Sequence, residues 1–470
     1  MNLEEFRKRA HEAVDWVADY YENLEKKPVK SQSQPNEIYN QIPQKAPQQS
    51  ESFDALMNDL DNIIMPGITH WQHPHFHAYF PANASFPSII AEILTAGMGA
   101  QCMVWETSPA AAELEERMME WLKDLMKLPT SWSGVIHDTA STATLTAILS
   151  AREQITRFAI NNHGFDQQKL RVYCSTETHS SIEKGAKIAG IGKENVVKIP
   201  VDDQMAMNSK LLDLAIESDL KNGFIPCCVI AAIGTTSTVA IDPTDEIGLI
   251  CQRHSVWLHV DAAYAGSAMI LPEMDNLRKG LDYADSFVFN PHKWLFTNFD
   301  LSAYFVKDKN ALIDTFEILP EYLKTKTRGQ VNDYRDWGIQ LGRRFRALKL
   351  WFVMRSFGVE NMQKTLRNHI DWAKWFEQQI ADHPDLELIV SRSLNVLVFR
   401  VDNHKSSQED LNQLNENLLH SINATGKAFI THTKVNGKYG LRVVLGQTYL
   451  EERHVQELWD LLQNHLGIKN

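Results

Sequence analysis

The alternation of short apolar segments with helical stretches limits the fold more than any other feature of the sequence. Six segments have the apolar character of strands: residues 170–174, 196–200, 227–233, 256–260, 286–289 and 303–306. Helical segments such as 209–222 and 245–254 lie between them. Strands that are apolar on both faces are typical of a mainly parallel sheet with helices on both sides. The sequence therefore predicts a large α/β domain whose ligand site lies beyond the carboxyl ends of the strands.

The N-terminal region predicts one exposed helix and an extended segment. Residues 3–24 carry apolar side chains at helical spacing, and Asn2 with Glu5 forms a capping-box pattern. A single helix cannot bury its own apolar stripe, so this helix must pack on the main body or on another subunit. The Pro- and Gln-rich residues 28–50 favour extended chain.

The C-terminal region predicts a smaller domain. A long helical stretch begins near Gly342, and two strand segments (395–401 and 439–445) then alternate with helices at 408–423 and 451–466. This pattern is typical of a small α+β domain. The predicted division is an N-terminal helical and extended dimerisation segment (1–85), a large α/β domain (86–365) and a small C-terminal α+β domain (366–470).

Composition excludes several classes of protein. The chain has 47 Lys and Arg against 59 Asp and Glu, a formal net charge of −12 that disfavours nucleic acid and anionic membranes as partners. Its apolar runs are shorter than the roughly 20 residues that span a bilayer, and no apolar signal region follows Met1. Five cysteines without a C-x-x-C pair disfavour a disulfide scaffold and a Cys-rich zinc site. We therefore expect a cytoplasmic enzyme.

Two strand segments end at residues that suit one cofactor. Asp261 ends the segment VWLHVD, and Lys293 follows the segment SFVF after the residues NPH. A lysine among apolar residues favours the neutral amine, which can attack a carbonyl. A buried aspartate suits a partner that stays protonated, such as a pyridine nitrogen. Together they predict a site for pyridoxal 5′-phosphate (PLP), which bonds to a lysine and presents a ring nitrogen to an acidic residue.

The phosphate of this cofactor requires hydrogen-bond donors. In the segment GVIHDTASTATL a short apolar strand leads into a helix, with Thr139, Ala140 and Ser141 at the turn. Hydroxyl groups and free backbone N–H groups at a helix N-terminus bind anions. Such caps also begin many helices for structural reasons alone. This segment therefore supports a phosphate site only in combination with Lys293 and Asp261.

Four longer motifs resemble a known family. They are HVDAAYAGSA with NPHKW, the run WQHPHFHAYFPA, the THSS at 178–181, and DYRDWGIQLGRRFRALKLWFV. These motifs resemble the group II PLP-dependent amino-acid decarboxylases, most of all the aromatic-L-amino-acid decarboxylases, densely from residue 65 to 355. The resemblance implies the PLP-dependent transferase fold type I. It also implies an obligate homodimer with active sites at the subunit interface.

The resemblance also implies roles for individual residues. Lys293 would bind the cofactor covalently, Asp261 would contact its pyridine nitrogen, and His179 would stack on its ring and help to orient the substrate carboxylate. The other implied cofactor-binding residues are Ala140, Ser141, Thr236, Ala263, Asn290 and His292. Without the resemblance, His179 would be interpreted as an ordinary loop histidine.

Tyr334 lies in a polar segment of low periodicity between Gly329 and Gly338, as functional lids often do. The resemblance implies a mobile loop that closes over the neighbouring active site, where the tyrosine protonates Cα after carbon dioxide leaves. Related enzymes with phenylalanine at this position form aldehydes by oxidative deamination. Tyr334 therefore favours simple decarboxylation.

The run HWQHPHFH contains four histidines, but no acidic residue or cysteine lies close by in the sequence, so we expect no metal site. The resemblance instead implies an aromatic pocket wall for the substrate side chain. Its substrate-binding residues, besides His179, are Trp71, Tyr79, Phe80, Pro81, Ala82 and Gly342. Ala82 replaces a hydroxyl residue of animal members, and Gly342 matches plant members that act on indoles.

The predicted reaction is decarboxylation of tryptophan, 5-hydroxytryptophan, DOPA, tyrosine or phenylalanine to the amine. Aromatic acetaldehyde synthesis, decarboxylation of another class such as glutamate, and a catalytically inactive scaffold are the alternatives. The basic run at Arg343, Arg344, Arg346 and Lys349 is either a solvated helix face or an anchor for the loop or the partner subunit.

Overall fold

The structure is a computed structural model that describes residues 1–318 and 329–466. Contacts divide the chain into two compact units. The terminal unit comprises residues 1–81, 374–389 and 398–470, and the central unit comprises residues 82–373 and 390–397. The three-domain division expected from the sequence stays a prediction.

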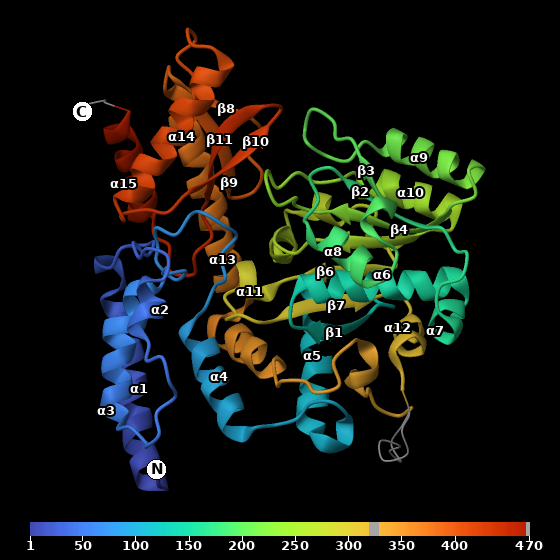
Figure 1. The fold of residues 1–470 in the computed structure, drawn as a ribbon. Helices are drawn as coiled ribbons and strands as arrows, with labels where there is room; N and C mark the ends of the chain where they lie inside the picture. Colours follow the sequence, from blue (N-terminus) through green and yellow to red (C-terminus); the bar gives the residue numbers. More distant parts are fainter. Residues whose placement is uncertain (319–328, 467–470) are drawn as a thin grey trace. The chain divides into compact units, whose positions relative to one another are not determined.

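The central unit is built on a seven-stranded sheet of order β1-β7-β6-β5-β4-β2-β3 (Figure 1). Its strands are β1 (Ser133–His137), β2 (Leu170–Ser175), β3 (Val196–Ile199), β4 (Ile225–Ala232), β5 (Trp257–Asp261), β6 (Ser286–Phe289) and β7 (Ser302–Val306). β7 is antiparallel to both of its neighbours, and the pairs from β6 to β3 are parallel. The mainly parallel α/β sheet predicted from the apolar strands is confirmed.

Helices cover this sheet, as Figure 1 shows. The helices of the central unit are α4 (Phe86–Met98), α5 (Pro109–Leu125), α6 (Ala140–Thr156), α7 (Ala159–His163), α8 (Ser181–Ile188), α9 (Ser209–Lys221), α10 (Thr244–His254), α11 (Pro291–Trp294) and α12 (Lys309–Phe316). Cys228 and Ile230 of β4 pack in one buried cluster with Ile148 of α6 and Ile182 of α8. α9 and α10 also pack on β4, which explains why this strand is apolar along its whole length.

The terminal unit contains a four-stranded sheet of order β10-β11-β9-β8. Its elements are α1 (Leu3–Glu22), α2 (Glu37–Gln41), α3 (Phe53–Asp59), β8 (Leu386–Leu388), β9 (Val396–Val401), α14 (Gln408–Ala424), β10 (Thr431–Val435), β11 (Lys438–Val444) and α15 (Glu452–His465). The predicted strands and helices of the C-terminal region are confirmed, whereas the short β8 and β10 were missed. α13 (Ala347–Asp382) contributes to both units and has a non-helical residue at Gly358.

Segments from the N-terminal and C-terminal regions contact each other within the terminal unit. The guanidinium of Arg453 donates to both carboxylate oxygens of Glu25, at 2.6 and 2.8 Å, and Val29 N donates to Gly426 O at 2.9 Å. The N-cap predicted for the first helix is present, because Asn2 Oδ1 accepts from Glu5 N at 2.9 Å. No residue of α1 is buried in the described chain.

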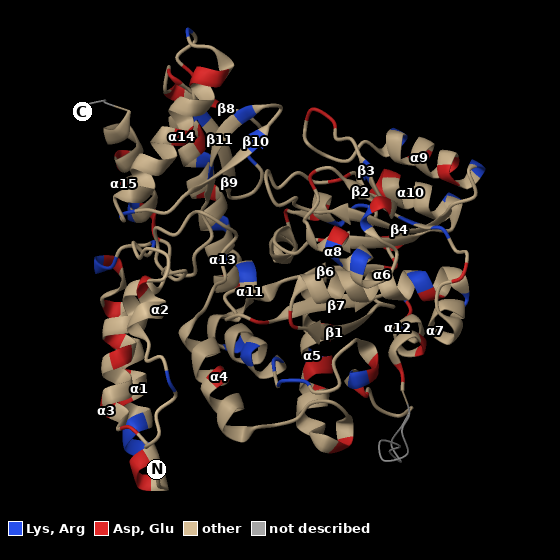
Figure 2. Ribbon diagram, viewed as in Figure 1, with Lys and Arg blue, Asp and Glu red and all other residues tan. Residues whose placement is uncertain are grey.

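Surface charge is mixed in sign. Figure 2 shows basic and acidic residues interspersed along the helices of both units. Among the described helices, none combines the length and the apolar character that a bilayer span requires.

Several buried histidines of the central unit make stability depend on pH. Burial lowers the pKa of His137 and His292 to about 3 and that of His259 to about 4. An unfolded histidine titrates near 6.5, so below that pH the unfolded chain binds more protons than the folded one. These residues therefore stabilise the fold fully above pH 6.5, and that contribution is lost as the pH falls toward 4.

We expect His259→Asn to flatten this dependence. His259 is fully buried and contacts Ser286 Oγ at 2.9 Å. Its removal should reduce the slope of unfolding free energy against pH, between pH 6 and 4.5, by about 1.4 kcal/mol per pH unit. Urea denaturation of the cofactor-free protein at a series of pH values measures this slope. The exposed His163→Asn is the control, and equal slopes for wild type and His259→Asn would contradict the prediction.

Candidate active site

Asp261 and Lys293 lie at the same edge of the central sheet. β5 ends at Asp261, and the neighbouring parallel strand β6 ends four residues before Lys293. Backbone hydrogen bonds join the two strand ends, from Ala262 N to Val288 O at 2.9 Å and from Asn290 N to Ala263 O at 3.0 Å. Because the strands are parallel, the carboxylate and the amine emerge beyond the same edge, as predicted.

Both residues are held by short-range hydrogen bonds. Asp261 is 8% exposed, and its Oδ1 accepts from Ala263 N at 3.0 Å. The backbone of Lys293 is fixed twice, because its N–H donates to Asn290 O at 2.9 Å and its carbonyl accepts from Asn83 Nδ2 at 2.7 Å. The local backbone therefore fixes where each side chain starts.

His179 follows β2 at this edge. Its Nδ1 accepts from Ser181 N at 3.1 Å and lies 2.8 Å from Ser181 Oγ, so the neutral ring carries its proton on Nε2. Desolvation lowers the pKa of His179, the carboxylate of Asp261 opposes this shift, and the ammonium of Lys293 adds to it. His179, Asp261 and Lys293 thus interact electrostatically, although His179 is exposed in the single chain.

The start of α6 lies at the same edge. β1 is antiparallel to β7, and β7 is antiparallel to β6, so β1 runs parallel to β6 and its end reaches the edge of Lys293. Thr139 caps α6 with its Oγ1, which accepts from Thr142 N at 3.4 Å. Ala140 and Ser141 form the first turn. The free N–H groups of this turn can hold a phosphate.

Ser302 lies between Asn290, which follows β6, and Asp138, which precedes α6. Its hydroxyl donates to Asn290 Oδ1 at 2.6 Å and lies 3.4 Å from Asp138 O. Asn290 is buried, and through Ser302 the end of β6 is linked to the loop before α6. Thr236, after β4, is exposed, and Ala263, after β5, is partly exposed. Every predicted cofactor-binding residue therefore ends or follows a strand that reaches this edge.

The predicted substrate residues are divided between the units. Trp71, Tyr79, Phe80 and Pro81 belong to the terminal unit, and Ala82 and Gly342 belong to the central unit. In the terminal unit the ring of Trp71 stacks on Tyr79, with centroids 5.8 Å apart and planes at 19°. The guanidinium of Arg442 lies 4.8 Å from the centre of the Phe80 ring. Trp71 and Tyr79 thus form one stacked pair, and the role of these residues in substrate binding stays a prediction.

Tyr334 lies in an unexpected environment. It begins the short 3₁₀ helix Tyr334–Trp337 and is 3% exposed, in an apolar cluster that includes Trp337. Arg343 lies 5.0 Å from the centre of its ring. Burial raises the pKa of Tyr334 well above 10, so the hydroxyl keeps its proton. The polar residues 319–328 of the expected loop lie outside the described residues, and the catalytic role of Tyr334 stays a prediction.

Two histidines of the run HWQHPHFH contact residues near the C-terminus. His75 Nε2 lies 2.9 Å from Glu457 Oε2, and His77 Nδ1 lies 3.1 Å from Val444 O. Within residues 1–318 and 329–466 no group of three or more His, Cys, Asp or Glu side chains is arranged to hold a metal ion.

Arg343 and Arg346 are buried, so the interpretation of the basic run as a solvated face is wrong for them.

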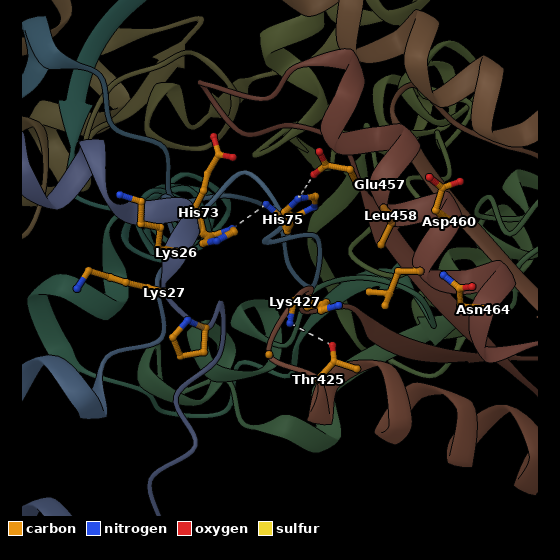
Figure 3. A pocket seen from close by; sticks show the side chains of 14 residues that line it. Lys26, Lys27, His73, His75, Thr425, Lys427, Glu457, Leu458, Asp460 and Asn464 are labelled. Carbon is orange, nitrogen blue, oxygen red and sulfur yellow. Dashed lines mark hydrogen bonds and ion pairs between the residues drawn. The ribbon is translucent and has the colours of Figure 1, made fainter.

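A cavity of about 660 Å³ lies in the terminal unit (Figure 3). Lys26, Lys27, His73, His75, Lys427 and Glu457 are among its lining residues. None of the predicted cofactor or substrate residues lines this cavity. The candidate active site is therefore defined by the sheet edge and not by this cavity.

The residues at the sheet edge fit PLP by their chemistry. The site offers an amine at Lys293, a carboxylate at Asp261 and a neutral imidazole at His179, all in electrostatic contact. The first turn of α6 offers N–H groups for the phosphate. Sequence reasoning missed Asn83 and Ser302, which fix Lys293 and Asn290. Single polar residues without a motif give no signal that could have found them.

Comparisons with known proteins identify the family of the chain. Residues 35–402 match the model of the pyridoxal-dependent decarboxylase conserved domain. The chain is 42% identical to a phenylacetaldehyde synthase of Rosa hybrid cultivar, covering 99% of this chain and 94% of that protein. It is 41% identical to tryptophan decarboxylase 2 of Oryza sativa, covering 99% and 95%. The crystal structure of Catharanthus roseus tryptophan decarboxylase with L-tryptophan superposes with a TM-score of 0.94 at 38% identity, covering 99% of each chain.

We expect Asp261→Asn to separate cofactor binding from turnover. An amide cannot hold the proton on the pyridine nitrogen, whereas Lys293 and the α6 turn still bind the cofactor. A loss of two pKa units in that proton corresponds to about 2.7 kcal/mol, or roughly a 100-fold decrease in kcat. Absorbance of bound PLP and release of carbon dioxide measure the two effects. The control is the exposed Asp314→Asn, and near-normal kcat in Asp261→Asn would contradict the assignment.

Proposed function

The chain belongs to the family of pyridoxal-dependent decarboxylases, and we propose that it converts aromatic L-amino acids to the corresponding amines and carbon dioxide. The observation that carries this proposal is the shared sheet edge of Lys293, Asp261 and His179. Bound PLP supplies a conjugated ring that accepts the electrons left on Cα when the carboxyl group departs.

The residues of the chain prepare this reaction. Lys293 would hold the cofactor through its amine, which would have to give way to the amine of the substrate. Asp261 keeps a proton on the pyridine nitrogen, because its buried carboxylate favours a positive partner. His179 places a flat neutral ring against the cofactor and, through Nε2–H, can donate to the substrate carboxylate.

The substrate class is supported by the aromatic surface and by the relatives. Trp71 and Tyr79 form stacked rings of the kind that bind a flat side chain by area and offset stacking. Relatives of about 40% identity include tryptophan and tyrosine decarboxylases. A Cβ atom added at Gly342 would lie 3.4 Å from Nε2 of Gln101, which is an ordinary van der Waals contact. The lack of a side chain at Gly342 therefore leaves space beside Gln101. This small residue favours an indole or a permissive pocket.

Tyr334 is proposed to protonate Cα after carbon dioxide leaves. Its hydroxyl is the right kind of donor, because its raised pKa keeps the proton bound until a strong base forms. To act, the side chain must leave its cluster with Trp337 and reach a site that closure protects from water. Aldehyde synthesis is the second candidate function, because two relatives are phenylacetaldehyde synthases.

Comparison of wild type with Tyr334→Phe tests both candidates. We expect the wild type to form amine and carbon dioxide in equal amounts from aromatic amino acids and negligible amine from glutamate. Without the hydroxyl proton donor, Tyr334→Phe should divert at least about half of its turnover to oxidation by dissolved dioxygen, which with water yields aldehyde, carbon dioxide, ammonia and hydrogen peroxide. Chromatography of the products and a peroxide assay measure this ratio. Aldehyde as the main wild-type product would overturn the proposal.

We further propose a homodimer, located in the cytoplasm, whose subunits together form each active site. α4 carries five exposed apolar side chains along one face: Phe86, Ile90, Ile93, Leu94 and Met98. α1 adds exposed Leu3, Phe6 and Val14. Apolar faces of this extent mark protein interfaces, and a second copy of this chain is the occupant that the family supports. The five cysteines are free thiols, which fits a reducing compartment.

We expect Ile90→Arg to disrupt the dimer. Ile90 is 53% exposed in the single chain, and a charge at the centre of an apolar interface should weaken association at least about 100-fold. Light scattering after size-exclusion chromatography measures the mass. Leu214→Arg, at a 61% exposed apolar position on α9, is the matched control and should remain dimeric. A monomeric wild type, or an unchanged Ile90→Arg, would contradict the proposal.

A further inference from the structure

The loop after Lys293 bonds back to His292, the residue that precedes the predicted cofactor lysine. This loop, residues 295–301, joins α11 to β7. Its last residue, Leu301, donates its N–H to His292 Nδ1 at 3.0 Å, and His292 N lies 3.4 Å from Leu301 O. Both residues are buried. A shift of the loop at Leu301 must therefore move His292, which is the neighbour of Lys293.

Lys349 of α13 holds this loop from the other side. Its ammonium donates to Asn298 O at 3.2 Å and to Asp300 O at 3.1 Å, and it pairs with Glu92 at 3.0 Å. The side chain is 1% exposed, so its three N–H groups have three protein acceptors in place of water. Burial lowers the pKa of Lys349 to about 7, and the charge of Asp300 opposes this shift. Such a buried ammonium is stable only while its acceptors stay in place.

Glu92 of α4 completes the arrangement. Its carboxylate pairs with Arg344 as well as Lys349, and its Oε2 accepts from Asn298 Nδ2 at 3.4 Å. Ser88, one turn earlier, accepts from Asn298 N through its hydroxyl at 3.2 Å. The loop is therefore fixed between a glutamate on α4 and a lysine on α13.

Arg346 holds a different atom of the same loop. Its guanidinium binds the Asp300 carboxylate twice, at 2.9 and 3.2 Å. Lys349 instead binds backbone carbonyls, so its contacts do not depend on which side chains the loop carries. The lysine thus fixes the path of the backbone, which sets where Leu301 meets His292.

We infer that Lys349, with Glu92, is a positioning residue for PLP attachment, holding residues 298–301 so that His292 and Lys293 stand in register with Asp261. Neither residue is in the proposed catalytic set, and the role rests on the proposed function of Lys293. Its effect passes through Asn298 and Asp300 to Leu301 and then to His292. An alternative role is stabilisation of the fold alone.

Lys349→Met tests the inference, because it keeps the length of the side chain and removes its charge. Loss of charge-assisted hydrogen bonds should weaken PLP binding about 10- to 100-fold. It should also slow the attachment of PLP to Lys293, which is followed by trapping the attached form with borohydride. Fluorescence titration with PLP and mass spectrometry of the trapped peptide measure these effects. Lys364→Met, an exposed lysine of the same helix, is the control.

Glu92→Gln tests the same role if Lys349→Met does not fold, because its amide oxygen still accepts from Lys349. We expect about a tenfold weaker affinity for PLP, and less than additive losses when both substitutions fold and are combined. Lower thermal stability with unchanged PLP affinity and attachment rate would overturn the inference and leave a structural role. A wild type that attaches no PLP at Lys293 would overturn the proposed function itself.

Discussion

The parallel pairing of β5 with β6 is the constraint on which the site depends. It fixes the ends of two neighbouring strands at one edge, and backbone hydrogen bonds at 2.9 and 3.0 Å continue the pairing past both strands. The side chains of Asp261 and Lys293 can then face one ligand without extending far from the backbone. The antiparallel β7 brings β1 into the same direction, which adds the first turn of α6. One sheet thus gathers an acid, an amine and an anion-binding turn.

Buried ion pairs surround this edge and give it rigidity. Arg343 pairs with Glu115 at 2.5 Å and also donates to Ile136 O at 2.8 Å, which ties α5 and β1 to the segment after Tyr334. Breaking one member of such a pair leaves a buried charge without compensation. Arg343, Arg346 and Lys349 of the sequence motif GRRFRALK are buried and support the backbone that they contact, so loss of their charge should affect that backbone.

Sequence reasoning succeeded where burial controls residue type. β4 and β5 are apolar because both faces are covered, so their positions in the sequence could be predicted. β10, THTKV, has exposed polar alternate residues and was missed, since its pattern resembles a loop. The basic run was ambiguous because charge normally indicates solvent, and only the fold shows that Glu92, Glu115 and Asp300 lie opposite. The burial of Tyr334 was unexpected because its neighbours in the sequence are polar, and only the fold brings it into an apolar cluster.

The terminal unit has a consequence for how the chain is synthesised. Glu25 and Val29 bond to Arg453 and Gly426, partners that leave the ribosome last. Glu25 and Val29 must therefore wait for these partners through almost the whole of translation, while most of the central unit is already free to fold. A chain arrested near residue 400 would carry a folded middle and an unfinished beginning.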